Sequence, residues 1–453
     1  MKTFLPPALL LAAGTGLVMA QTNAESARFR LITLDPGHFH ASLVQKSMYP
    51  DVDPVVHVFA PGGEDVREHL KRIESFNSRA IQPTHWQEQV YTGPDFFQKM
   101  LAEKPGNIVV IAGNNLHKTD YILKSVQAGL NVLADKPMAI APADFEKLQQ
   151  AFTVAATNHV LIYDIMTERY EITTVLQREL SRQRELFGEL EKGSPENPAI
   201  EMKSVHYFSK TVAGVPLKRP EWFFDIRQEG EGITDVATHL VDLVQWEAFP
   251  EQALHPSDVN VLSARHWPTP ITREQFKKVT GADHFPDFLG GEVKDGALQI
   301  YANGEFTYRL RDICAKVTVS WDFESPTGSG DTHFSVMRGT KACLTIRQGA
   351  EQKFKPVLYI EKTGDIDDLA FEEALKSSIA ALQGNYPGVN FLREGKVWRI
   401  IVPEKYDLGH EAHFSQVAEN FLRFLRDGKL PDWETPNMLA KYATTISAYR
   451  LSR

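Results

Sequence analysis

Short apolar runs alternate with amphipathic stretches along the first third of the chain. The runs that we read as strands cover residues 28–35, 55–61, 107–113, 131–135 and 159–164. Between them, apolar residues recur every three or four positions, which is the spacing of helices. Because the runs are apolar throughout, we expect strands buried on both faces, as in a parallel sheet covered by helices. The pattern predicts an α/β fold, with a Rossmann-like, doubly wound parallel sheet over residues 27–150.

The pattern changes after residue 150. Residues 167–190 predict one long amphipathic helix, and two further helices are expected at 413–428 and 437–451. Alternating apolar and polar residues predict strands at 200–210, 259–267, 296–310, 314–323 and 342–349. We therefore expect a second, α+β domain over residues 151–453, with a large, open and mainly antiparallel sheet.

The first residues have the pattern of an export signal. Lys2 precedes an apolar run at 4–20 that closes on small residues, and a polar stretch follows. We expect a cleaved secretory signal over residues 1–20, hence an exported, periplasmic protein. An uncleaved membrane anchor is the alternative, but the run is short and holds two prolines and two glycines. No later segment is apolar enough to span a bilayer, so no stable membrane insertion is expected.

Composition narrows the range of partners. A chain of 453 residues is long enough for two domains, and 43% hydrophobic residues supply a core for each. A net charge of -9 provides no basic surface for nucleic acid or anionic lipid. Small neutral or polar molecules are therefore the expected partners.

Neither the cysteines nor the clustered histidines predict a metal site. Cys314 and Cys343 both lie in strand-like patterns, and a disulfide and two free thiols remain equally open. In the sequence HEAH, His410 and His413 are three residues apart, unlike the spacing in H-E-x-x-H. We assign no metal.

The turn after the first strand is a degenerate form of the dinucleotide-binding pattern G-x-G-x-x-G. It reads DPGHFH, with Asp35, Gly37 and His40 at the three glycine positions. The middle glycine, which allows close approach of a pyrophosphate, is retained. The second strand ends in Ala-Pro-Gly-Gly, without an acidic residue for a ribose, although Glu64 or Asp65 could take that role.

A lysine follows a predicted buried strand. Lys136 comes directly after residues 131–135. Ligands bind beyond the carboxyl ends of parallel strands, so Lys136 is expected to project into that crevice. The alternative is a surface lysine in a loop.

A histidine lies between two carboxylates in the stretch GEGITDVATHLVD. Asp235, His239 and Asp242 are spaced by four and three, which on a helix places them along one face. A histidine beside carboxylates is a natural proton acceptor near neutral pH. The alternative is an aspartate that caps a helix and a histidine in the core.

Two stretches are similar to the family of glucose-fructose oxidoreductase, inositol dehydrogenase and MocA. Residues 111–140 resemble its P-N-x-x-H motif followed by a helix and E-K-P, with Asn114, His117 and Lys136 in register and Asp135 in place of Glu. GEGITDVATHLVD resembles its glycine-rich stretch followed by D-x-x-x-H-x-x-D. Residues 219–246 and 329–342 resemble an exported branch of the family with a distinctive C-terminal domain.

The resemblance implies a cofactor, a mechanism and an assembly. The cofactor would be NAD or NADP, with NAD favoured, bordered by Gly37, His38, Phe39, Asn114, His117 and Lys136. His239 would accept the proton of a hydroxyl group, Lys136 would polarise its oxygen, and Asp235 would orient the pair. Burial beside a cationic neighbour would lower the pKa of Lys136. Family members form dimers or tetramers through the open sheet, so a homo-oligomer is expected.

Three residues are weaker candidates for a carbohydrate site. Arg169 follows the last strand of the first domain, and a salt bridge to Glu168 is its alternative role. Trp222 and Arg227 precede the proposed catalytic stretch and could line a sugar site, with packing between domains as the alternative.

Three functions remain open. The first is an oxidoreductase that keeps its NAD(P) bound and acts on a hydroxyl or carbonyl group of a sugar, glycoside or polyol. The second is a redox-neutral glycosidase or lyase that acts by transient oxidation and elimination. The third is a sugar-binding protein that lost its cofactor. Because Lys136, Asp235 and His239 occur together, we rank the oxidoreductase first.

Overall fold

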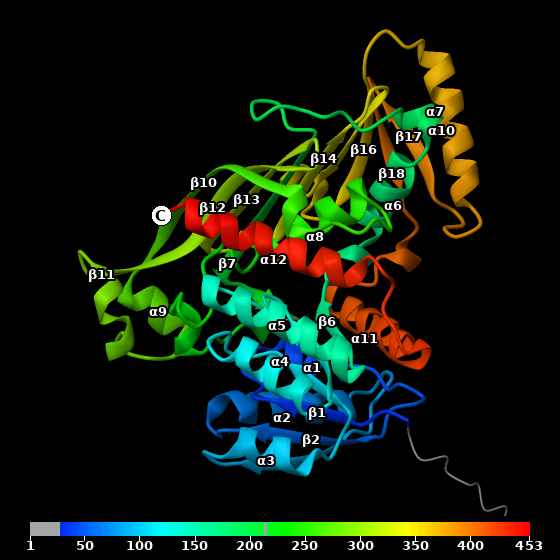
Figure 1. Ribbon diagram of the computed structural model, residues 1–453. Coiled ribbons are helices and arrows are strands. Elements are labelled where there is room, and N and C mark those ends of the chain that lie inside the picture. Colours follow the sequence, from blue (N-terminus) through cyan, green and yellow to red (C-terminus); the bar gives the residue numbers. More distant parts are fainter. Residues whose placement is uncertain (1–27, 213–214) are drawn as a thin grey trace, which may run out of the picture.

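The computed structural model describes residues 28–212 and 215–453, so the predicted signal at 1–20 lies outside the described residues. The described chain forms two sheets, each with helices packed against it, and Figure 1 shows the smaller sheet below the larger one.

The first sheet has six parallel strands in the order β3-β2-β1-β4-β5-β6. The strands are β1 (Leu31–Leu34), β2 (Val55–Ala60), β3 (Gln87–Thr92), β4 (Ile108–Ile111), β5 (Asn131–Asp135) and β6 (Ile162–Ile165). The helices are α1 (His40–Leu43), α2 (Glu64–Ser78), α3 (Phe96–Glu103), α4 (Lys118–Gln127) and α5 (Pro142–Asn158). Every residue of β1 and β4 is buried, as expected for apolar strands covered on both faces. The predicted Rossmann-like sheet is confirmed, and it extends to Ile165, beyond the boundary expected at 150.

The second sheet has ten strands and is mainly antiparallel, as predicted. Its order is β10-β12-β13-β7-β14-β15-β16-β18-β17, with β11 paired to β12, and β13 and β7 run parallel. The strands are β7 (Ile200–Ser209), β10 (Val259–Ile271), β11 (Val293–Lys294), β12 (Ala297–Leu310), β13 (Ile313–Glu324), β14 (Thr332–Arg338), β15 (Ala342–Arg347), β16 (Val357–Lys362), β17 (Asn390–Glu394) and β18 (Val397–Ile401). A hairpin of β8 (Thr211–Val212) and β9 (Val215–Pro216) stands apart.

Seven α-helices of the described chain follow the first sheet. They are α6 (Ile172–Ser181), α7 (Arg184–Phe187), α8 (Ala237–Ala248), α9 (Arg273–Thr280), α10 (Asp368–Leu382), α11 (His410–Asp427) and α12 (Glu434–Leu451). The single helix predicted over 167–190 is wrong. A 3-10 turn, η1 (Thr167–Tyr170), comes first, the Glu171 side chain then caps α6, and the extended backbone of Gln183 separates α6 from α7.

The last two helices return to the first sheet. Phe414, Phe421 and Tyr442 are buried in the same apolar cluster as Leu31 and Ile108. Figure 1 shows α11 and α12, in orange and red, beside β6 and α5. The second domain is therefore not confined to one side of a boundary at 150, because its C-terminal helices complete the core of the first.

The two cysteines are free. Cys314 lies on β13 and Cys343 on β15, and β7 and β14 separate these strands. Three strand spacings amount to roughly 14 Å, about twice the Cα separation that a disulfide spans. Of the alternatives left open by the sequence, the structure has the free thiols.

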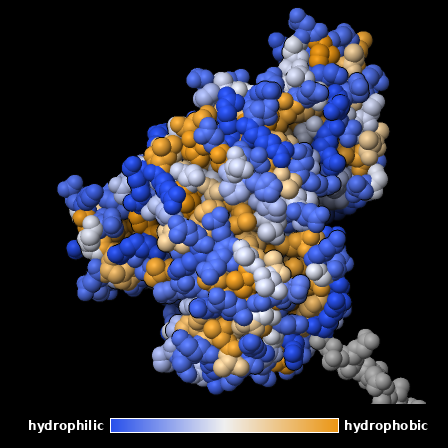
Figure 2. All heavy atoms as spheres, viewed as in Figure 1, coloured by the Kyte–Doolittle hydropathy of each residue, from blue (hydrophilic) through white to orange (hydrophobic). Residues whose placement is uncertain are grey.

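The visible surface in Figure 2 is mostly hydrophilic, with smaller apolar areas between the charged residues. None of the helices in the described part of the chain combines the length and the apolar character that crossing a membrane requires.

Candidate active site

Two cavities meet at the turn after β1. The histidine cavity has a volume of about 670 Å³ and lies where the carboxyl ends of β1 and β5 face the large sheet and the start of α11. Histidines gather on its wall: His38, His40, His206, His239, His333, His410 and His413. The glycine-turn cavity, of about 660 Å³, is lined by Gly37, Gly62, Asp65 and Trp222, and it shares His38 and Phe39 with the first. A ligand of dinucleotide length could extend from one cavity into the other.

Lys136 lines the histidine cavity directly after β5. Its side chain is 10% exposed, and its Nζ lies 2.5 Å from Oδ1 of Asp235. Burial acts to lower the pKa of Lys136, but the carboxylates of Asp235 and Asp135 outweigh it, and the pKa is raised. The lowered pKa expected from the sequence is therefore wrong, because the neighbours of Lys136 include two anions. Lys136 remains a cation and a hydrogen-bond donor.

His239 lies in the first turn of α8 and lines the same cavity. Its Nδ1 has no hydrogen-bond partner among the described residues. Burial, reinforced by the positive charge of Lys136, lowers the pKa of His239 to about 4. The imidazole is therefore neutral at pH 7 and free to accept a proton.

The three residues D-x-x-x-H-x-x-D do not share one helical face as predicted. Asp235 precedes α8 and pairs with Lys136, and no hydrogen bond joins it to His239 in the described structure. Asp242 lines neither cavity and bonds Arg169 and Lys441 instead. A close approach also shapes this stretch: a Cβ on Gly232 would lie 1.9 Å from the carbonyl oxygen of Ala302 on β12.

Sequence reasoning missed two buried ionisable groups. Lys118 is almost fully buried, its Nζ donates to the carbonyl of Asp135 at 3.1 Å, and burial lowers its pKa to about 8. Glu229 lines the histidine cavity, and burial, followed by repulsion from Asp235, raises its pKa well above the usual value. The spacing of Lys118 from the apolar Ile122 on α4 was the available signal for its burial.

The turn after β1 fits a dinucleotide. A Cβ on Gly37 would lie 3.0 Å from the ring of Trp222 and 3.2 Å from the Asp65 carboxylate, so a side chain here would crowd both neighbours. Trp222 donates from Nε1 to Asp65 at 2.8 Å. Burial raises the pKa of Asp35, and the Tyr121 hydroxyl donates to its carboxylate at 3.1 Å. The raised pKa and the hydrogen bond from Tyr121 both weaken the electrostatic repulsion between the Asp35 carboxylate and a phosphate.

Of the other two predicted cofactor neighbours, Asn114 lies near the glycine turn and His117 does not. Asn114 lies beside Gly37 and donates from Nδ2 to Gln228 at 2.6 Å, at the junction of the domains. His117 is exposed before α4, faces Tyr121 and lines neither cavity. The structure therefore does not bring His117 to the proposed cofactor site.

Arg227 is also outside the cavities. Its side chain is 63% exposed and pairs with Asp225, and it donates to the carbonyl of Phe288. The suggested sugar contact is not supported, because these local partners hold the guanidinium on the surface. Trp222, in contrast, lines the glycine-turn cavity rather than the histidine cavity.

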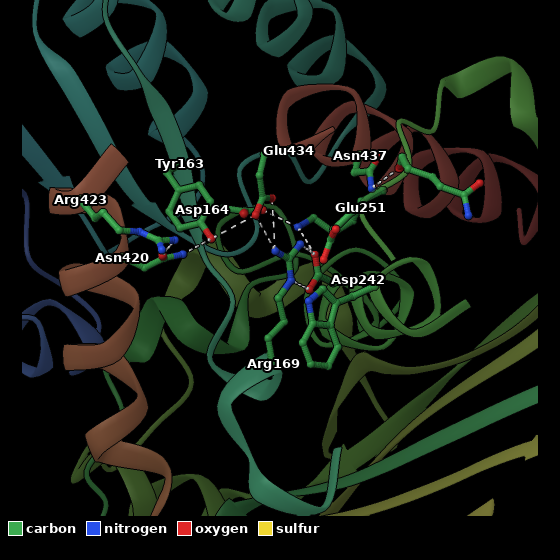
Figure 3. A network of polar contacts seen from close by, with 12 residues as sticks. Tyr163, Asp164, Arg169, Asp242, Glu251, Asn420, Arg423, Glu434 and Asn437 are labelled. Atoms are coloured by element: carbon green, nitrogen blue, oxygen red, sulfur yellow. Dashed lines mark hydrogen bonds and ion pairs between the residues drawn. The ribbon is translucent and has the colours of Figure 1, made fainter. Parts of the chain in front are cut away.

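Arg169 is buried in an ion-pair network (Figure 3) and lines neither cavity. Its Nε and Nη2 bond both oxygens of Asp242 at 2.6 and 2.7 Å, and its Nη1 bonds Glu434 at 2.9 Å. The structure therefore does not bring Arg169 to the site where a substrate contact was predicted. The alternative partner, Glu168, instead lies 3.4 Å from His410.

The same network includes Lys441. Its Nζ lies 2.8 Å from Asp242 and 2.6 Å from Asp164, and the Tyr442 hydroxyl donates to Asp164 at 3.2 Å. These residues belong to α8, α12 and β6. The network therefore fixes the helix that carries His239 to the last strand of the first sheet.

A buried histidine beside the glycine-turn cavity predicts a pH effect on stability. Both ring nitrogens of His69 lack partners in the described structure, and burial lowers its pKa to about 3. Below its unfolded pKa of about 6.5, the unfolded chain binds a proton that the folded chain does not, so stability falls by about 1.4 kcal/mol per pH unit from this group until about pH 3. In His69→Leu, the free energy of unfolding should fall less steeply between about pH 6.5 and about pH 4 than in the wild type. Urea unfolding at a series of pH values measures this slope. The exposed His85→Leu should keep the slope, and equal slopes in both variants would contradict the assignment.

Two family models match the chain. The model described as "Oxidoreductase family, NAD-binding Rossmann fold" covers residues 45–163, and "Putative oxidoreductase C terminal domain" covers residues 176–453. No sequence among the curated proteins matches.

Solved structures agree with these models. The chain is 54% identical to "a putative oxidoreductase from Parabacteroides merdae", with a TM-score of 0.92 over 94% of this chain and 98% of that one. A levoglucosan dehydrogenase in complex with NADH and levoglucosan is 11% identical, with a TM-score of 0.59 over 93% and 97%. A 3-ketoreductase from Actinomadura kijaniata, in complex with NADP and TDP-benzene, is 12% identical, with a TM-score of 0.54 over 94% and 97%. The last two share the fold. The chain therefore belongs to the Gfo/Idh/MocA family of oxidoreductases and combines an NAD(P)-binding Rossmann domain with the C-terminal domain of these proteins.

Proposed function

We propose that this protein interconverts a hydroxyl and a carbonyl group of a sugar, glycoside or related polyol, with a tightly held NAD(P). The observation that carries the proposal is the ion pair of Lys136 with Asp235 beside the unpartnered ring of His239, in a cavity that adjoins the glycine turn. A fixed cation and a neutral base in one cavity are what removal of a hydroxyl proton requires.

The residues of the glycine turn would hold the cofactor. Gly37 lines the glycine-turn cavity and would let a pyrophosphate approach the backbone, and His38 and Phe39 lie where the two cavities meet. When bound, the nicotinamide ring would accept or donate the hydride.

The side chains of this protein would manage the proton and the oxygen. His239, with a pKa lowered to about 4, is neutral and accepts the hydroxyl proton. Lys136 donates a hydrogen bond to the same oxygen as negative charge develops on it. Asp235 holds the ammonium group of Lys136 in place through the 2.5 Å contact.

The walls of the histidine cavity suit a carbohydrate. Phe223 and Trp321 offer aromatic faces, and Asp331 and His206 offer polar groups. The similar folds of a levoglucosan dehydrogenase and a 3-ketoreductase are consistent with this substrate class. Export to the periplasm, supported by the run at 4–20, would favour a cofactor that stays bound during turnover.

A redox-neutral elimination is the second candidate. Glu229 favours it, because a carboxyl group in the histidine cavity whose pKa is raised by burial could protonate a departing glycosidic oxygen. Product analysis separates the two: oxidised sugar without bond cleavage supports the oxidoreductase, and cleavage without net redox change supports the elimination.

The first test is the identity of the bound cofactor. The purified protein is denatured, and mass spectrometry of the supernatant should find NAD(H) or NADP(H) at about one molecule per chain. Gly37→Leu should lose it, because its side chain would enter the space against Trp222. Gly290→Ala is the matched control, since its Cβ would meet nothing within 4 Å. A wild-type protein that is empty and takes up neither dinucleotide would favour a sugar-binding protein instead.

A further inference from the structure

Three side chains of metal-ligand type meet at the carboxyl ends of β1 and β5. His40 Nδ1 lies 3.0 Å from Oδ2 of Asp135, and His38 Nδ1 lies 3.7 Å from the same oxygen. One ligand atom from each of the three lies within 4.8 Å of the other two. Within residues 28–212 and 215–453, no other trio of His, Cys, Asp and Glu side chains is so close.

These distances match a coordination site. Ligand atoms that each lie about 2.1 Å from a tetrahedral zinc are about 3.4 Å from one another. The observed contacts of 3.0 and 3.7 Å lie on either side of that value, so a bound ion would require only small side-chain movements.

The ligand nitrogen of His38 has one weak partner in the turn. The backbone N–H of His40 donates to Nδ1 of His38 at 3.4 Å, and a bound ion would replace this long hydrogen bond.

Nearby cations do not occupy the carboxylate. Lys136 forms its 2.5 Å ion pair with Asp235, and Lys118 donates to the backbone carbonyl of Asp135 rather than to its side chain. The Asp135 carboxylate, almost fully buried, therefore has the two histidine rings as its ion-pair partners within 4 Å in the described part of the chain.

A hydrogen bond that only stabilises the turn explains part of the cluster. An Asp135–His40 pair accounts for one ring, and the backbone N–H of His40 bonds the other, but neither contact accounts for the approach of His38 Nδ1 to 3.7 Å from the same carboxylate oxygen. Phe414, at 4.6 Å between ring centroids, packs against His40 from α11 and limits its rotation. Preorganised rings of this kind are expected at a metal site.

We propose that His38, His40 and Asp135 bind a divalent transition-metal ion whose open coordination position faces the histidine cavity. Two histidines and one carboxylate suit Zn²⁺ or Fe²⁺, and three protein ligands with an open position are typical of a catalytic rather than a structural ion. Both histidines line the cavity, so the ion would bind an oxygen of a ligand held there. The site does not depend on the proposed redox function.

The test is metal content. Protein purified without a polyhistidine tag is stripped with a chelator, dialysed in separate samples against Zn²⁺ or Fe²⁺ and desalted. Mass spectrometry of the elements should find about one ion per chain in the wild type and less than about 0.1 in His38→Ala/His40→Ala. The matched control is His333→Gln, a histidine of the same cavity outside the cluster, which should keep its ion.

Further measurements on the same samples exclude misfolding and loss of cofactor as causes of a lower metal content. Co²⁺ in the wild type should give visible absorption bands that are absent from the double variant, and far-UV circular dichroism should be the same in both. Dinucleotide is measured in the same samples, so that loss of cofactor is not mistaken for loss of metal. A wild type that retains less than about 0.1 ion per chain, or a double variant that retains as much as the wild type, would overturn the proposal.

Discussion

Lys136→Met should lower kcat/KM by about 10²–10³ or more in protein shown by circular dichroism to be folded, since one donor to a developing oxyanion typically has that effect. The reason is the position of the ammonium group, buried in the histidine cavity and held by Asp235. Lys46→Met is the matched control: this lysine lines the same cavity but pairs with Glu411, and its loss should leave turnover near the wild-type rate.

A pH profile separates a chemical role for Lys136 from a structural one. The wild type should show no acid limb near pH 6.5, because the pKa of His239 is lowered to about 4. Lys136 contributes to that lowering, so the residual activity of Lys136→Met should lose its acid tolerance at a higher pH than the wild type. His239→Ala should be impaired by a similar factor. Near-normal rates in both variants would show that neither residue takes part in the reaction.

The first sheet was predictable because burial on both faces leaves a signal in the sequence. The strands β1 and β4 are apolar throughout, and so are recognisable without any partner. The edge strand β3 was missed, since it reads QEQVYT and its residues are mostly exposed. A polar edge strand is fixed by pairing with β2, which the sequence alone does not indicate.

The candidate site was predictable only where a local motif carries it. Lys136 and His239 were found from short motifs, and both line the histidine cavity. Asp242 belongs to the same motif, but its partners Arg169 and Lys441 are 73 and 199 residues away in the chain. The raised pKa of Glu229 likewise depends on burial among residues distant in the chain, which has no local signal.

The metal-type cluster was hidden for a related reason. His40 was read as the replacement for the third glycine of a phosphate-binding turn, His38 as a neighbour of the cofactor, and Asp135 as the counterpart of Glu in E-K-P. The strand order places β4 between β1 and β5, and only the side-chain distances show that the turn after β1 reaches the end of β5.

Lys441→Met should lower the free energy of unfolding by about 3–5 kcal/mol, the usual cost of removing one partner from a buried ion pair. Methionine nearly matches the length of lysine, so the loss reports charge rather than a cavity. Asp242 and Asp164 would then remain buried without the cation that they share. Lys71→Met is the control, because this lysine is 78% exposed and should change stability by less than about 0.5 kcal/mol in urea unfolding.

A double variant tests whether pairing is the cause. Asp242→Asn removes one of the two charges that Lys441 neutralises, so in Asp242→Asn/Lys441→Met the combined loss should be smaller than the sum of the single losses by at least about 1 kcal/mol. Additive losses would instead attribute the effect to packing. Asp242 lies one turn along α8 from His239. The ion pairs of Asp242 therefore also hold His239, the proposed base, close to the first sheet. Variants of this network that still fold should therefore lose turnover through misplacement of His239, although none of its residues lines the histidine cavity.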